Sequence, residues 1–199
     1  MRPDVAEGLL EFMQVMPDGE QDARFILENP DIFTDPLLPV LGNPEGSVTL
    51  VKFNDYACPH CRNAERDIER LIAGNPDLRV LVREFPILGP GSLSRARLAM
   101  AIHALGGQNA YEEIKLDLFA SGDVDDGTID QIAGFAGLDP DAVRARMQDP
   151  LFNASFDRSM EIARALNISG TPAFIVGTSV IRGRIPLADL RATIARETP

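Results

Sequence analysis

The sequence predicts an α/β fold in which a βαβ unit and a later ββα unit are separated by a block of helices. The run 48–53 is apolar on both faces, as a strand buried inside a sheet is, and the run 78–85 is expected to form a second strand, closed by Pro86. The segment between them, about 59–73, has helical periodicity, and strand, helix and strand in this order form a parallel pair. The remaining predicted elements are strands at 173–176 and 180–182 and a last helix at 186–196.

Composition sets the broad class. The chain has 199 residues, 45% hydrophobic and 25% charged, which is typical of a globular protein with one core and a sizeable insertion. Its formal net charge of −11 argues against nucleic acid as a partner, because phosphate backbones need a basic face. No apolar run is long enough for a membrane span, and residues 1–5 lack the features of a secretory signal. Either the protein is cytosolic or the chain begins after a removed signal.

Residues 1–42 are predicted to be an N-terminal helical extension and linker. Val5, Leu9 and Met16 recur at helical spacing, and a second short helix is expected at 20–28, before a proline-rich connector. The two helices either fold onto their own domain or use an exposed apolar stripe for homo-oligomer formation through residues 1–30.

Three further segments follow. Residues 43–91 contain the βαβ unit, whose helix has one apolar stripe, with charged residues around the rest. The stripe is formed by Ala64, Ile68, Leu71 and Ile72, and the charged residues are Arg62, Glu65, Arg66, Glu69 and Arg70. Residues 92–166 are predicted to be a helical insertion with a break at Gly106-Gly107, and residues 167–199 contain the ββα unit.

The chain has two cysteines, Cys58 and Cys61, three positions apart. A disulfide between them closes too short a loop to constrain much chain, so a purely structural bond is a poor explanation. Zinc needs about four ligands, and the two cysteines and two histidines would need carboxylates to complete a set. The spacing therefore favours a redox pair, and no metal site is predicted.

The run Cys58-Pro59-His60-Cys61 directly follows a buried strand and opens a helix. This places Cys58 at the positive end of the helix dipole, where free N–H groups stabilise a thiolate, and Pro59 suits the first helical position. His60 adds a donor beside the Cys58 sulfur, which should make the disulfide more oxidising. Cys61, one turn further on, is expected to be more buried and to act as the resolving thiol.

These residues resemble a known superfamily. The Cys58–Cys61 tetrapeptide and the run Gly170-Thr171-Pro172-Ala173-Phe174 are similar to the active site and the cis-proline loop of DsbA-like thiol–disulfide oxidoreductases. Residues 27–30 and 84–89 look like the ScsC and Com1-type branch of that superfamily. The resemblance implies a thioredoxin fold interrupted by a helical insertion. It also implies no cofactor beyond the Cys58–Cys61 disulfide, cysteine-containing protein substrates, a redox partner that reoxidises or reduces the site, and a periplasmic or otherwise secreted location.

The resemblance further implies that the bond before Pro172 is cis and that the Thr171 backbone presents an edge to an extended substrate peptide. An ordinary trans-proline turn is the alternative, because most X-Pro bonds are trans.

One position departs from the family. Its members commonly carry an acidic residue six positions before the first cysteine, and here that position is Lys52. Lys52 shares a strand face with Val48 and Leu50, and Glu84 falls on an equally apolar face of the next strand. We expect a buried Lys52–Glu84 pair near Cys61, with Glu84 as a proton relay. The alternative is that Lys52 extends its amine to water.

The leading hypothesis for function is a dithiol oxidase that accepts attack by substrate thiolates at Cys58. A disulfide isomerase or reductase, working as an oligomer through the N-terminal extension, is the second. Thr171 before the proline resembles the isomerase-like branches, whereas His60 favours the oxidase. A non-catalytic thioredoxin-like binding domain is the third, against which the intact Cys58–Cys61 motif argues.

Overall fold

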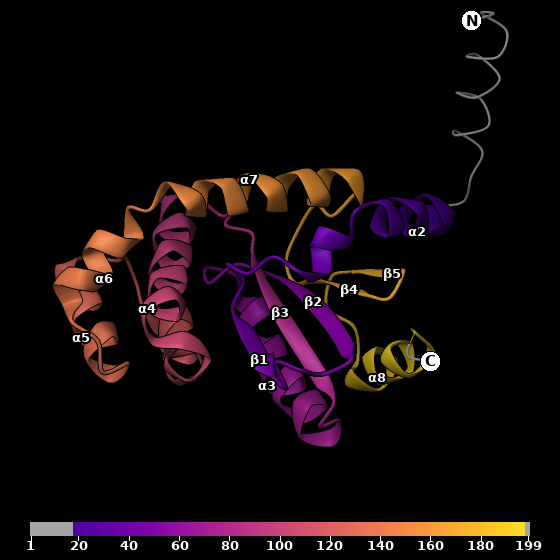
Figure 1. The fold of residues 1–199 in the computed structure, drawn as a ribbon, viewed down its shortest axis with the longest axis horizontal. Helices are drawn as coiled ribbons and strands as arrows, with labels where there is room; N and C mark the ends of the chain where they lie inside the picture. The colour runs from indigo at the N-terminus through magenta and orange to yellow at the C-terminus, as the bar shows by residue number, and fades with distance from the viewer. Residues whose placement is uncertain (1–17, 198–199) are drawn as a thin grey trace, which may run out of the picture.

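A computed structural model describes residues 18–197, and its centre is a five-stranded mixed sheet with the strand order β1-β3-β2-β4-β5 (Figure 1). Strands β2 and β3 are parallel, and the other three pairings are antiparallel. The strands are β1 (Val40–Gly42), β2 (Val48–Asn54), β3 (Leu78–Glu84), β4 (Ala173–Val176) and β5 (Ser179–Arg182). The predicted α/β class and the parallel pair are confirmed.

Helices cover both faces of this sheet. They are α2 (Asp18–Glu28), α3 (Pro59–Gly74), α4 (Pro90–Ala120), α5 (Asp126–Phe135), α6 (Pro140–Met147), α7 (Pro150–Ala165) and α8 (Leu187–Glu197), with a short 3-10 turn η1 (Pro30–Phe33). In Figure 1, α3 and α8 lie below the sheet, and α2 and α7 lie above it. The sheet is therefore the middle layer of the fold.

The side chains on the two faces of β2 pack in two separate hydrophobic clusters. Leu50 packs in one cluster with residues of α3 and α8, while Val51 and Phe53 pack in the other with residues of α2 and α7. This alternation follows from the two-residue period of a strand. It places Lys52, on the face of Leu50, toward α3 and the cysteines.

The helical block lies between β3 and β4, as the sequence predicts. Helix α4 runs from Pro90 to Ala120 but is interrupted at Gly107, whose φ of 73° lies outside the helical region. Glycine adopts such a φ without a steric penalty, which explains the break predicted at Gly106-Gly107. Helices α5 and α6 pack against α4.

The connector before the first predicted strand contains an element that the sequence analysis did not predict. Residues 40–42 form β1, an edge strand that pairs antiparallel with β3. Because it is only three residues long and follows Pro39, it carries no strand periodicity that a sequence pattern could reveal. The linker is thus partly built into the sheet.

The structure describes one of the two predicted N-terminal helices. Helix α2 agrees with the segment expected at 20–28, and it buries Ile26 in the second cluster. Asp22 of this helix forms an ion pair with Arg182 of β5, at 2.6 Å. The expected helix containing Val5, Leu9 and Met16 lies outside the described residues.

Candidate active site

Cys58 is the N-cap of α3. The Cys58 backbone is extended, with φ and ψ of −87° and 114°, and its carbonyl accepts a hydrogen bond from the Arg62 N–H at 3.2 Å. Pro59 occupies the first turn of the helix. This puts the thiol at the end of the helix where backbone N–H groups lack intrahelical partners. Pro59 and His60 are exposed, so the first turn is open to a partner molecule.

Asp55 holds the loop that carries Cys58. Its carboxylate accepts hydrogen bonds from the N–H groups of Ala57 (2.8 Å), Ile87 (2.9 Å) and Leu88 (3.0 Å), and its own carbonyl accepts from the Cys58 N–H at 3.0 Å. The side chain is buried. One carboxylate therefore fixes the loop before Cys58 to the loop after β3.

The Thr171–Pro172 peptide bond is cis, and the loop that contains it lies against Cys58. The Cys58 Sγ donates to the carbonyl oxygen of Thr171 at 3.3 Å, although the two residues are 113 positions apart. The backbone of Thr171 is thus placed beside the first thiol, as the resemblance implies.

The two thiols have different surroundings. Both are free, but Cys58 is 5% exposed and Cys61 is 0% exposed. Burial raises the pKa of the Cys61 thiol to about 12, and the nearby Lys52 ammonium opposes that rise. Cys61 is therefore protonated at neutral pH and can act as a nucleophile only when a base removes its proton.

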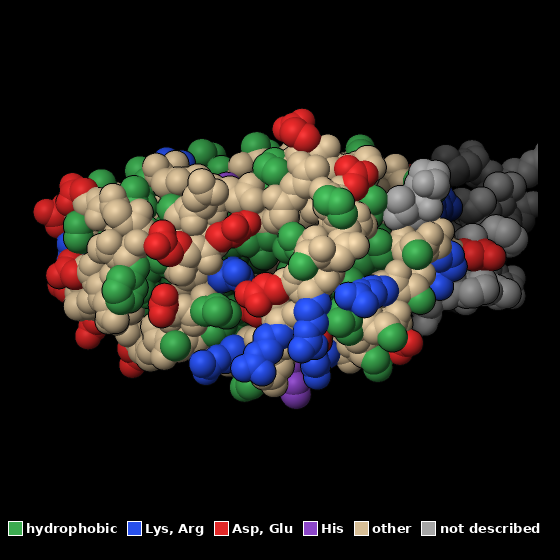
Figure 2. Space-filling view, turned by 90° about the horizontal axis from the view of Figure 1, so that it is seen from below, with side chains coloured by type: hydrophobic (Ala, Val, Ile, Leu, Met, Phe, Trp, Pro, Cys, Tyr) green, Lys and Arg blue, Asp and Glu red, His purple; other side chains and the backbone are tan. Residues whose placement is uncertain are grey.

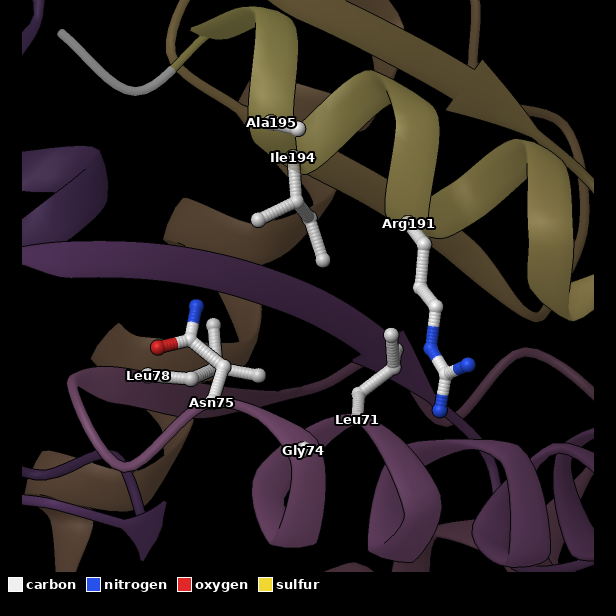
Figure 3. A pocket seen from close by; sticks show the side chains of 7 residues that line it. All are labelled: Leu71, Gly74, Asn75, Leu78, Arg191, Ile194 and Ala195. Atoms are coloured by element: carbon white, nitrogen blue, oxygen red, sulfur yellow. The ribbon is translucent and has the colours of Figure 1, made fainter.

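A hollow of about 260 Å³ opens beside Cys58 and is lined by Tyr56, Ala57, Cys58, Pro59, Arg62, Arg95 and Phe119. A larger hollow, of about 420 Å³, lies at the other end of α3, where Leu71 and Ile194 point toward each other between α3 and α8 (Figure 3). The first of these borders the reactive sulfur and is the candidate substrate site.

The charged residues behind the cysteines pair differently from our expectation. Lys52 is buried, but its ion-pair partner among residues 18–197 is Glu65 of α3 rather than Glu84. The predicted Lys52–Glu84 ion pair is therefore wrong, and so is the expectation that Lys52 extends to water. The Lys52 ammonium also lies 5.6 Å from the centroid of the Phe119 ring.

Glu84 accepts a hydrogen bond from Tyr56 instead. The Tyr56 hydroxyl lies 2.9 Å from Glu84 Oε1 and 2.7 Å from the Tyr111 hydroxyl. Burial raises the pKa of Glu84 to about 8, although the Tyr56 hydrogen bond and the Lys52 ammonium both lower it. Lys52 therefore acts electrostatically on both Glu84 and Cys61.

Sequence reasoning missed Glu65 and Asp55. Glu65 was assigned to the charged side of its helix, but it is 2% exposed. Its position, four residues after Cys61 and three before Ile68, places it on the buried stripe, and that spacing was the available signal. Asp55 gives no such signal, because its partners are backbone groups of a distant loop.

The described residues contain neither a candidate metal site nor a helix that could span a membrane. In the part of the chain that the structure describes, no group of three or more His, Cys, Asp or Glu residues is placed to hold a metal ion. Across residues 18–197, none of the helices is long and apolar enough to cross a bilayer.

Several solved structures are similar. The thiol-disulfide exchange protein alpha-DsbA2 of Wolbachia pipientis is 28% identical with a TM-score of 0.80, covering 90% of this chain and 97% of that one. A thioredoxin-like oxidoreductase of Silicibacter pomeroyi is 37% identical with a TM-score of 0.75, covering 84% and 97%. A periplasmic thioredoxin-like protein of Salmonella enterica is 27% identical with a TM-score of 0.74, covering 86% and 95%. The catalytic domain of Proteus mirabilis ScsC, 19% identical with a TM-score of 0.75, covers 88% and 97% and shares the fold.

Curated relatives include longer proteins. Two Na⁺/H⁺ antiporters NhaA, from Salinispora arenicola and Salinispora tropica, are 27% and 26% identical over 156 residues, or 78% of this chain. The chain spans about a quarter of their length, 24% in each case. Disulfide bond formation protein D of Bacillus subtilis is 24% identical over 177 residues, which are 80% of this chain and 76% of that protein.

The sheet order, the Cys58–Cys61 pair at the start of α3 and the facing Thr171–Pro172 loop define a thioredoxin-fold domain of the DsbA-like thiol–disulfide oxidoreductase class. The model of the thioredoxin family matches residues 35–196. The chain belongs to the thioredoxin family, and its predicted resemblance to DsbA-like proteins is confirmed, whereas its likeness to ScsC is a likeness of fold.

Proposed function

We propose that the chain is a dithiol oxidase of protein substrates, acting through Cys58 and Cys61. The observation that carries the proposal is the asymmetry of the two thiols: Cys58 caps α3 beside an open hollow, and Cys61 is fully buried one turn behind it. Only one sulfur of such a pair is accessible to a substrate.

The reaction starts from the Cys58–Cys61 disulfide. A substrate thiolate attacks Cys58 Sγ, which forms a mixed disulfide, breaks the Cys58–Cys61 bond and releases Cys61, which takes up a proton. A second substrate thiolate then attacks the substrate sulfur of the mixed disulfide and expels Cys58. The substrate dithiol has lost two electrons and the protein pair has gained them. A disulfide-bearing redox partner must accept these electrons to restore the site.

The substrate is proposed to bind along the Thr171–Pro172 loop. A carbonyl oxygen 3.3 Å from the Cys58 sulfur belongs to a backbone edge that an extended peptide can pair with. Main-chain pairing accepts many sequences, which suits cysteine-containing proteins as a substrate class.

Lys52 and Glu84 are proposed to serve proton transfer to and from Cys61. The support is electrostatic: Lys52 lowers the pKa of both groups, and Glu84, with a pKa of about 8, changes charge near neutral pH. Replacing Glu84 by Gln should slow the step in which Cys61 expels substrate from a preformed mixed disulfide, and the slowing should grow above pH 7. An unchanged rate across pH 6–9 contradicts the relay.

A disulfide isomerase or reductase is the second candidate. Thr171 before the cis proline and the N-terminal extension both favour it. The use of that extension in homo-oligomer formation, through residues 1–30, stays a prediction. His60, exposed in the first turn of α3, favours the oxidase because a ring N–H donor beside the Cys58 sulfur stabilises the thiolate of the reduced form. A periplasmic or secreted compartment is proposed with either activity, since such disulfides persist where the environment is oxidising.

One pair of measurements separates these functions. We expect a reduction potential for Cys58–Cys61 well above the value of about −270 mV typical of thioredoxin, together with oxidation of reduced ribonuclease. A potential near that of thioredoxin, with activity only on scrambled ribonuclease, supports the isomerase or reductase instead. The Cys58→Ser variant should lack both activities. Wild-type protein without activity in either assay would indicate a non-catalytic binding domain.

A further inference from the structure

A group of arginines surrounds the redox site of this acidic chain. Basic residues are outnumbered by 30 to 19, yet Figure 2 shows Lys and Arg side chains gathered on the face that lies below the sheet in Figure 1. We call this group the arginine strip. It consists of Arg62, Arg66, Arg70, Arg95, Arg184 and Arg191.

The geometry of α3 makes the strip continuous. Arg62, Arg66 and Arg70 follow one another at four-residue spacing on the exposed side of α3, so they extend about 12 Å along the helix from the end that carries Cys58. Arg191 Nη2 lies 3.4 Å from the Arg70 carbonyl, which adds α8 to the strip. Arg62 and Arg95 line the hollow beside Cys58, so the strip begins at the reactive sulfur.

The strip keeps most of its charge uncompensated. Among residues 18–197, Arg62, Arg66 and Arg95 form no ion pair, and Arg95 donates to the Gly122 carbonyl instead. Asp67 is shared by Arg70, at 3.7 Å, and Arg184, at 2.8 Å. Elsewhere on the surface, Arg144 contacts three carboxylates and Arg158 contacts two. Arg79, Arg97 and Arg164 also form no ion pair among residues 18–197, but they are single residues on β3, α4 and α7. Arg62 and Arg66, by contrast, are one turn apart on α3, and Arg62 and Arg95 line the same hollow beside Cys58.

We propose that the arginine strip binds an acidic segment of the polypeptide whose cysteine reacts with Cys58. The inference rests on the proposed exchange activity and specifies its substrate class: proteins with Asp or Glu within about four residues of the reacting cysteine. An extended chain advances about 3.3 Å per residue, so these side chains fall along the 12 Å of the strip. At about 0.15 M salt the screening length is about 8 Å, so the local strip outweighs the distant negative charge of the whole chain.

The test compares two peptides of equal length with one cysteine each, flanked by glutamates in one and by glutamines in the other. Each peptide cysteine is joined to thionitrobenzoate as a mixed disulfide, and the protein is the full chain with Cys61→Ser. Cys58 attacks the peptide sulfur, a Cys58–peptide disulfide forms, and thionitrobenzoate leaves as a coloured thiolate. The observable is the ratio of the Glu-peptide to the Gln-peptide rate constant.

We expect the Glu peptide to react faster at 0.15 M salt and Arg62→Gln/Arg66→Gln to lower the ratio about fivefold. The matched control, Arg24→Gln/Arg164→Gln, removes the same two charges from α2 and α7 and should leave the ratio unchanged. At about 1 M salt the ratio should approach one in all proteins.

Three results would overturn the proposal. The first is an equal ratio in wild type and in Arg62→Gln/Arg66→Gln. The second is salt-dependent dimerisation of the wild type in light scattering that the double variant abolishes, because the strip would then bind the acidic surface of a second copy. The third is binding to vesicles of anionic lipid that depends on the same arginines. Failure of the exchange activity on which the proposal rests is distinct, because neither peptide would then release thionitrobenzoate.

Discussion

Lys52 and Glu65 form an ion pair that is buried between β2 and α3, directly behind the redox site. Neither partner alone belongs in an apolar interior, because removing a charge from water costs several kcal/mol. Together they place a fixed positive charge near both Cys61 and Glu84.

Lys52→Met should lower the free energy of unfolding by about 3–5 kcal/mol, because it leaves Glu65 charged and unpaired in the core. Adding Glu65→Gln should recover part of this loss. Urea denaturation measures both variants. Lys115→Met, which breaks the pair with the half-exposed Glu69 at 3.4 Å, is the control and should cost less than about 1 kcal/mol. Equal losses in Lys52→Met and Lys115→Met would contradict this account.

Stability should fall as pH rises, because of Glu84. Its pKa in the folded protein is raised from 4.5 to about 8. Below pH 4.5 the Glu84 carboxyl is neutral in both the folded and the unfolded protein. Between pH 4.5 and 8 it ionises in the unfolded chain but stays neutral in the folded protein, so its contribution to the free energy of unfolding is lost over this window. The loss is at most about 5 kcal/mol. Glu84→Gln should flatten the dependence of urea midpoints on pH, and parallel profiles for the two proteins would refute the assignment.

Asp55→Ala should weaken both the fold and the site. It removes the acceptor of three backbone N–H groups, which we expect to cost about 3 kcal/mol and to slow reaction of Cys58 with an aromatic disulfide about tenfold. Asp125→Ala is the control, because it removes an exposed helix cap, in which the carboxylate accepts from the N–H and the hydroxyl of Thr128 and which is worth about 1 kcal/mol. The Cys58 rate should not change in that control. A normal rate in Asp55→Ala would show that the loop holds its shape without the carboxylate.

Alkylation should distinguish the two thiols of the reduced protein. At pH 7.5, iodoacetamide should modify Cys58 and leave Cys61 intact, because Cys61 is fully buried and its pKa is raised to about 12. Peptide mass spectrometry locates the adduct. Unfolding in urea should make both thiols react. Rapid labelling of Cys61 in the folded protein would mean that α3 opens readily.

The parts of the fold that sequence analysis predicted are those with a local signal. Strand β2 is apolar on both faces, β3 carries an apolar residue at every second position from Leu78 to Val82, and Pro59 and Gly107 mark where helices begin or break. The pairing of Lys52 was not predictable in the same way. Glu65 and Glu84 are both buried behind the cysteines, and only packing decides that Glu65, rather than Glu84, reaches the Lys52 ammonium. The role of Asp55 likewise depends on a loop 32 residues away in sequence.

The separation of 113 positions between Cys58 and Thr171 also affects how the protein is made. During synthesis both cysteines leave the ribosome long before the loop that completes their site. Until β4 joins β2, the thiol of Cys58 has neither its carbonyl neighbour nor the backbone edge proposed for substrates. The nascent chain therefore carries the two cysteines before the Thr171 loop is in place beside them. The proposed recognition of substrate proteins can begin only after β4 and β5 have joined the sheet.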